Sequence, residues 1–223
     1  MAAHLDLDEQ EQIAQMRHFW SKYGNAITWL LILVFGGFAA WNGWQYWQQK
    51  TALQAAALYD ELERTVPSKD AEKIQRVWGD LQSKGGSTVQ TYQGGLLAAM
   101  ALAEAGKPEP ARAALQWVVD KSSDDVLAGL ARIRLAGLEL DAQAYDKALA
   151  LLTSKVPAEL EPLAEDRKGD IQLAQGQTDA AKTAYKKAYK GLTLDLEYRR
   201  IVEAKLNALG VNAQDIDADQ GKS

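Results

Sequence analysis

The chain has 223 residues, a formal net charge of −5 and 47% hydrophobic residues, enough for one packed domain of ordinary size beside a short N-terminal segment. It contains no block of basic residues, so we expect no nucleic acid among its partners. It has no cysteine, and its two histidines, His4 and His18, lie near its start. The rest of the chain therefore lacks thiol and imidazole nucleophiles and the usual zinc ligands, and we predict a protein that is not an enzyme and has no cofactor or metal site.

The first predicted element is a membrane-spanning helix in the uncharged stretch between Lys22 and Lys50. About 20 mostly apolar residues are needed to cross a bilayer as a helix, and residues 26–41 form an apolar run. Aromatic residues collect at both membrane–water boundaries, and here they flank the run: Trp20, Tyr23 and Trp29 at one end, Trp41, Trp44, Tyr46 and Trp47 at the other. We predict a transmembrane helix over residues 23–47. The alternatives are a buried helix of a soluble domain and a cleaved signal peptide, which the acidic tail before the run disfavours.

The charges around this helix predict its orientation. Arg17 and Lys22 precede it and only Lys50 follows closely, and positive residues tend to stay in the cytoplasm. Residues 1–22 are therefore predicted to be a cytoplasmic tail, with everything after Lys50 on the outer side.

Small residues in the predicted span recur three or four positions apart, along one face of the helix. Such residues allow close approach between membrane helices, where packing drives association. We therefore take three of them as candidate contacts with a partner helix: Gly36, Ala40 and Gly43.

The helical pattern continues beyond the span and predicts a stalk that ends near Pro67. Ser68 is the expected N-cap of the next helix, which stops at Gly85 and Gly86. We assign residues 48–86 to the stalk helix and a first, degenerate helical pair.

From Thr88 onward short helices alternate with tight turns, and one arrangement recurs. A helix with a small residue in it is followed by a turn and then by an alanine in the next helix. These alanines, Ala111, Ala148 and Ala181, lie 37 and 33 residues apart, close to the roughly 34-residue period of tetratricopeptide repeats. We predict an all-α fold in which an N-terminal transmembrane helix is followed by a TPR-like α-solenoid with a C-terminal capping helix. The alternative is an irregular helical bundle in which the alanine spacing is coincidental.

The end of the chain completes this architecture. An amphipathic helix from about Leu196 to Leu209 is predicted to cap the solenoid, which spans residues 87–210. Residues 211–223 are polar and acidic, and we predict a disordered tail. The aspartates of this tail resemble the opening of a calcium loop, but Gly221 falls one place late and no closing glutamate follows, so we predict no calcium site.

The expected binding surface is the concave side of the solenoid, which the first helix of each repeat lines. Six candidate residues, named below, are placed on this side, and each is equally compatible with a place in the core. Met100 and Ile133 among them offer adaptable apolar contact to extended chains. If the protein were a hydrolase, carboxylates of the same set would have to carry the reaction. Aligning the repeats on their small residues places six candidates on this side: Gln93, Met100, Ile133, Gly137, Asp166 and Asp170.

Two stretches carry a resemblance to a known family: the aromatic run Gly43-Trp44-Gln45-Tyr46-Trp47 after the span, and the repeat from Gly169 to Ala188. Together with the order of the elements, they resemble the YfgM family of ancillary subunits of the SecYEG translocon, over about Glu9 to Leu209. The resemblance implies a single-pass protein of the bacterial inner membrane with its C-terminal domain in the periplasm. It also implies association with SecYEG and with a membrane-anchored periplasmic chaperone of the prolyl-isomerase type (PpiD), and chaperone-like help to unfolded exported proteins. The alternative is a TPR scaffold for another cell-envelope assembly machine.

Overall fold

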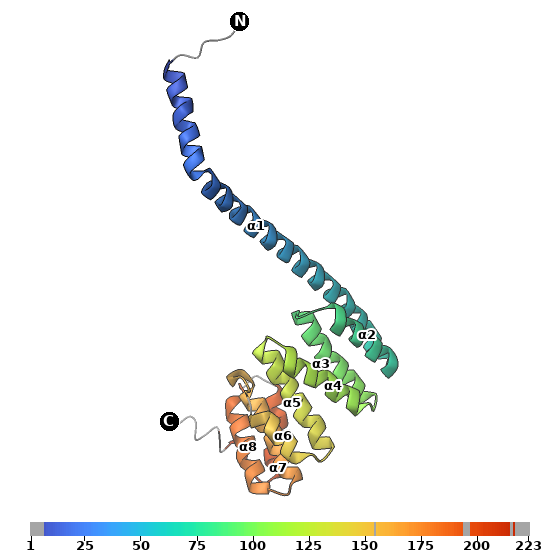
Figure 1. Ribbon diagram of the computed structural model, residues 1–223. Helices are drawn as coiled ribbons and strands as arrows, with labels where there is room; N and C mark the ends of the chain where they lie inside the picture. The colour runs from blue at the N-terminus through green and yellow to red at the C-terminus, as the bar shows by residue number, and fades with distance from the viewer. Residues whose placement is uncertain (1–6, 154, 194–196, 215, 217–223) are drawn as a thin grey trace. The chain divides into compact units, whose positions relative to one another are not determined.

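The computed structural model describes residues 7–153, 155–193, 197–214 and 216, and this part of the chain is helical without a strand (Figure 1). It divides into two compact units, Met1–Lys50 and Thr51–Ser223. The all-α prediction is confirmed. In chain order the elements are α1 (Leu7–Thr65), η1 (Val66–Ser68), α2 (Ala71–Lys84), α3 (Val89–Glu104), α4 (Pro108–Lys121), α5 (Asp125–Asp141), α6 (Tyr145–Thr153), η2 (Ala158–Leu160), α7 (Glu161–Ala174), α8 (Thr178–Gly191) and α9 (Glu197–Ala208).

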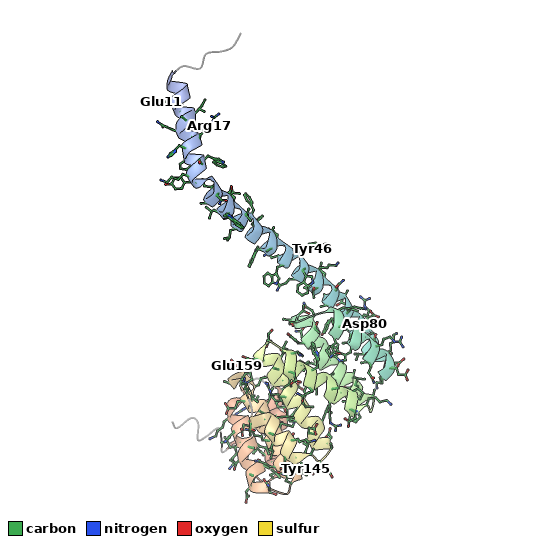
Figure 2. All side chains as sticks on the ribbon, in the orientation of Figure 1. Glu11, Arg17, Tyr46, Asp80, Tyr145 and Glu159 are labelled. Atoms are coloured by element: carbon green, nitrogen blue, oxygen red, sulfur yellow. The ribbon has the colours of Figure 1, made fainter. Side chains whose placement is uncertain are left out.

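Helix α1 is long and apolar enough to cross a membrane, the only such helix among the described residues. The side chains of its apolar run project outward (Figure 2), and Leu33, for example, is 74% exposed. A core helix of a soluble domain buries such side chains, so that alternative does not fit. The polar side chains of Thr28 and Asn42 donate hydrogen bonds to the carbonyls of Gly24 and Phe38, four residues earlier. The helix thereby satisfies these polar groups internally, as a hydrocarbon environment requires.

Helix α2 begins two residues later than the sequence suggested, so the expected N-cap was wrong. Pro67 and Ser68 form an additional 3-10 turn, η1, in which the Ser68 hydroxyl donates to the Thr65 carbonyl. The N-cap is Asp70, whose carboxylate accepts hydrogen bonds from the amides of Glu72 and Lys73. A carboxylate is a favourable cap because it satisfies free amides at the positive end of the helix dipole.

Three helical hairpins follow, α3–α4, α5–α6 and α7–α8, and their tight turns are alike. In each turn one residue adopts the left-handed conformation, and Gln143 does so where the other two turns have Gly106 and Gly176. In each turn the amide of the following residue donates to the carbonyl five positions earlier, a Schellman turn that closes the first helix. These bonds are Lys107 to Leu102, Ala144 to Glu139 and Gln177 to Gln172, each 2.8 Å long.

The alanines that indicated the repeat period occupy equivalent places in the core. Ala111, Ala148 and Ala181 are fully buried, and a large buried residue follows each of them by four positions. In the third hairpin, a Cβ atom added to Gly169 would lie 2.4 Å from the ring of Tyr185. The glycine is therefore what lets α7 and α8 approach each other, and the TPR-like interpretation is confirmed.

Helix α9 closes the stack by packing on α8, where Val202 and Leu206 are fully buried. The same apolar cluster includes Ala213 and Ile216. The predicted disorder from residue 211 is therefore wrong for the first part of that segment, because these two side chains supply apolar surface that α8 and α9 bury. The remainder of the predicted tail, residues 217–223, lies outside the described residues.

Candidate functional site

A groove of about 350 Å³ runs along the first helices of the three hairpins, α3, α5 and α7. Its volume is within the range typical of ligand-binding clefts. This is the surface on which the sequence places a binding site. The groove is lined by Ala99, Met100, Ala103, Glu104, Leu115, Arg134, Gly137, Leu138, Asp141 and Arg167.

The apolar part of the groove centres on Met100, which is 43% exposed. Its unbranched thioether adapts to apolar partners of different shape. Gly137 lies across from α7, and a Cβ atom there would meet the guanidinium carbon of Arg167 at 3.5 Å. The absence of a side chain at this position keeps the groove open beside the arginine.

Two arginines give the groove hydrogen-bond donors. The Arg134 guanidinium donates to the Leu96 carbonyl at 3.3 Å, and desolvation by the surrounding side chains lowers its pKa. Arg167 donates from one terminal nitrogen to Asp170 at 3.2 Å, and its Nε atom is buried without a hydrogen-bond partner among the described residues. An arginine has five N–H groups, so both side chains retain donors for a bound chain.

The groove is electrostatically mixed, because Glu104 and Asp141 also line it. Within the described residues neither carboxylate forms an ion pair with a lysine or arginine. Nor does the described part of the chain hold a group of three or more His, Cys, Asp or Glu side chains placed to bind a metal ion. The arrangement is suited to holding a polypeptide through apolar contact and hydrogen bonds.

Two of the six sequence candidates line the groove and the other four do not. Met100 and Gly137 line the groove, and Gln93 is exposed on α3 outside its lining. Ile133 is only 6% exposed and packs among the side chains between α5 and α6, so its placement on an open surface was wrong. Asp166 is 1% exposed, and its placement was wrong for the same reason. Both positions face neighbouring helices; Gly137, four residues after Ile133, lines the groove, whereas Asp170, four residues after Asp166, does not.

Asp166 and the half-buried Asp170 belong to a network that holds α9 against α7. The Lys205 ammonium lies 2.8 Å from both carboxylate oxygens of Asp166 and 2.7 Å from one oxygen of Asp170. Tyr198 donates to Asp166 at 2.6 Å and Tyr185 to Asp170 at 2.8 Å. Burial raises the pKa of both tyrosines, and their hydrogen bonds to the aspartates raise it further. Both carboxylates are thus engaged in a structural contact, which argues against the hydrolase alternative.

The sequence analysis missed most of the groove lining, including its two arginines, Arg134 and Arg167. They lie 33 residues apart, the same spacing as Ala148 and Ala181. A cation that recurs at the repeat period on the first helix of a hairpin is a signal that was available in the sequence.

The candidate contact positions in the predicted span are all open. Gly36, Ala40 and Gly43 are exposed, and a Cβ atom on either glycine would meet no heavy atom within 4 Å. No described side chain covers this face of α1, and its contact with a partner helix stays a prediction.

Residues 17–211 match the family described as tetratricopeptide repeat-like domain. The chain is also similar to curated proteins named ancillary SecYEG translocon subunit. The protein of Neisseria gonorrhoeae is 30% identical over 213 residues, which cover 94% of this chain and all of that protein. Those of Haemophilus influenzae and Escherichia coli are 28% and 23% identical, over 91% and 92% of this chain and 98% of each relative.

Proposed function

The chain belongs to the tetratricopeptide repeat-like family of ancillary SecYEG translocon subunits, and from this premise we propose that it is an adaptor and chaperone for exported proteins. In this proposal α1 anchors the chain in the bacterial inner membrane beside SecYEG. The repeats stand in the periplasm and bind segments of polypeptides as they leave the channel.

The membrane part of the proposal is supported by the composition and exposure of α1. Arg17 and Lys22 precede the apolar run and Lys50 follows it, so a cytoplasmic N-terminus is favoured. Gly36 and Gly43 offer a flat surface, and in lipid such surfaces associate by close packing. We propose that this face contacts a helix of the channel.

The chaperone part of the proposal is supported by the groove, and this single observation carries it. Unfolded chains present apolar side chains together with unpaired backbone carbonyls. Met100 and its alanine and leucine neighbours can contact the apolar side chains, and the terminal guanidinium nitrogens of Arg134 and Arg167 can donate to the carbonyls. Because methionine and arginine contacts are adaptable, one groove accommodates many sequences.

A second periplasmic partner is part of the proposal. We infer association with a membrane-anchored chaperone of the prolyl-isomerase type (PpiD), and this inference rests on the family resemblance without an assigned contact residue. Because both proteins would act on the same exported chains, joint recruitment to the channel is the expected consequence.

Site-specific photo-crosslinking in intact cells tests both parts. A photoreactive residue at Met100 should capture exported polypeptides, and one at Gln116, exposed on the outer helix α4, serves as the matched control. A photoreactive residue at Gly43 should capture channel subunits, with Phe38 on the opposite face of α1 as its control.

Equal capture from Met100 and Gln116 would show that the groove has no special role in binding. Capture from Gly43 of another envelope complex in place of the channel would favour the scaffold alternative. The PpiD inference fails if the isomerase is not recovered with the chain after mild solubilisation.

A further inference from the structure

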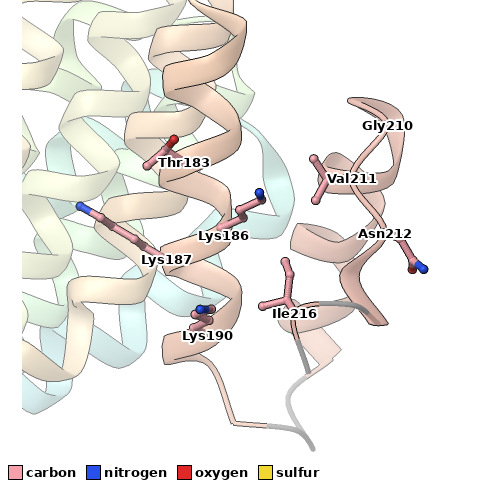
Figure 3. A pocket seen from close by; sticks show the side chains of 8 residues that line it. All are labelled: Thr183, Lys186, Lys187, Lys190, Gly210, Val211, Asn212 and Ile216. Carbon is pink, nitrogen blue, oxygen red and sulfur yellow. The ribbon is translucent and has the colours of Figure 1, made fainter. Parts of the chain in front are cut away.

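A second pocket, of about 530 Å³, lies between α8 and the segment that follows α9. Figure 3 shows Lys186 and Lys190 on α8 at one side of it and Val211 and Ile216 at the other. It shares no lining residue with the groove on α3, α5 and α7. Any ligand it holds is therefore additional to one in the groove.

The α8 side of this pocket is basic. Lysines 182, 186, 187 and 190 stand on α8 against a single acidic residue, Asp179. Lys187 lies 3.9 Å from Glu165, whereas Lys186 and Lys190 form no ion pair or hydrogen bond among the described residues. These two are four positions apart, where like charges on a helix repel each other. An anion placed between them would relieve this repulsion.

The opposite side of the pocket is formed by Gly210, Val211, Asn212 and Ile216, and two of these side chains are apolar. Ile216 is only 7% exposed, and Val211 packs against the same cluster of buried side chains from α8 and α9. The pocket thus combines a cationic wall with an apolar wall. A small inorganic anion would use only the first of these.

A membrane surface fits the pocket less well than a polypeptide does. Helices that lie on membranes insert large apolar side chains into the lipid. Among the described residues of α8, no large apolar side chain is exposed. The cations here border a recess instead of an apolar face.

We propose that this pocket docks an acidic segment of a partner polypeptide, with its carboxylates at Lys186 and Lys190 and an apolar side chain against Val211 and Ile216. The two lysines require a negatively charged ligand, and the apolar wall favours a peptide over a phosphate or a lipid headgroup. The site would give the protein a docking surface that acts independently of the groove.

The test measures binding of a fluorescein-labelled (Glu-Leu)4 peptide to the full chain in uncharged detergent, by fluorescence anisotropy. Lys186→Glu/Lys190→Glu should weaken binding about tenfold or more, because attraction becomes repulsion. Lys73→Glu/Lys147→Glu changes the net charge equally at exposed lysines on α2 and α6, and should change affinity less than about twofold. Circular dichroism should show the same helix content in all variants.

Equal losses in the two double variants would show unspecific attraction by net charge and would overturn the proposal. If a (Glu-Ser)4 peptide binds as tightly as (Glu-Leu)4, apolar contact with Val211 and Ile216 does not contribute to binding, and that part of the proposal is wrong. Displacement of the peptide by phosphatidylglycerol nanodiscs, but not by phosphatidylcholine ones, would assign the pocket to lipid. A chain that ends at Ile216 should bind within about threefold of the full chain, and a gain of about tenfold or more would make the chain's own acidic tail the occupant.

Discussion

Replacing Lys205 by methionine should destabilise the unit Thr51–Ser223 severely, because this lysine neutralises two carboxylates at once. Its ammonium lies within 2.8 Å of Asp166 and 2.7 Å of Asp170, and Asp166 is almost fully buried. Methionine keeps the apolar length of the side chain and removes the charge. Breaking a buried ion pair by removing one partner typically costs about 3–5 kcal/mol, because the other charge stays buried without compensation.

The assay is urea unfolding of the full chain in uncharged detergent, followed by circular dichroism. A loss of this size should lower the unfolding midpoint by about 1–3 M urea. Lys147→Met, at an exposed lysine on α6, is the control and should change the free energy of unfolding by less than about 0.5 kcal/mol.

The double variant Lys205→Met/Asp166→Asn tests the mechanism of this loss. Removing the buried charge of Asp166 should restore more than about 1 kcal/mol relative to Lys205→Met alone, since the two side chains interact directly. If Lys205→Met costs less than about 1 kcal/mol, or if Asp166→Asn makes it worse, the network does not hold α9 in the way described.

Three further predictions concern packing, pH and the groove. Gly169→Ala should lower the free energy of unfolding by about 1–3 kcal/mol, because its Cβ would clash with the Tyr185 ring. Gly79→Ala, with open space around it, should be neutral or stabilising. Thermal unfolding of both variants checks this. Folding raises the pKa values of Tyr185 and Tyr198, so above about pH 10 the unfolded chain releases tyrosine protons that the folded chain keeps. The free energy of unfolding should therefore fall as the pH rises. The fall should be steeper than in a variant with phenylalanine at both positions, by about 2.7 kcal/mol per pH unit for the two tyrosines together. If the stability of the two proteins falls with pH at the same rate, these tyrosines do not cause the pH dependence. Arg134→Gln should reduce photo-crosslinking of exported chains in the groove about tenfold without lowering the unfolding midpoint, and undiminished crosslinking would mean that the arginine does not contact them.

The fold was largely predictable because its determinants are local or periodic in the sequence. The apolar run of α1 can be recognised from composition alone. The spacing of Ala111, Ala148 and Ala181 follows directly from the need for small residues where paired helices cross, and all three are fully buried. The exception is the segment after Val211. Its composition is mostly polar, so the sequence did not indicate that Ala213 and Ile216 are buried against α8 and α9.

The site was predicted only in part, for a geometric reason. Positions four residues apart on a helix differ little in direction, so Ile133 and Gly137 were equally compatible with the concave side. Packing of α5 against α6 and α7 decides between them, and it buries Ile133. The contact between Asp166 and Lys205 joins residues 39 positions apart, and no periodicity in the sequence indicates it.

The proposed function depends most on α1 spanning the membrane with the repeats on its outer side, and the absence of cysteine makes this arrangement directly measurable. Single cysteines at Ser21, before the span, and at Gln116, exposed on α4, can each be labelled with a membrane-impermeant maleimide in spheroplasts. We expect the cysteine at position 116 to be labelled in intact spheroplasts and the one at position 21 only after lysis. Labelling in the reverse order, or of both positions before lysis, would contradict it.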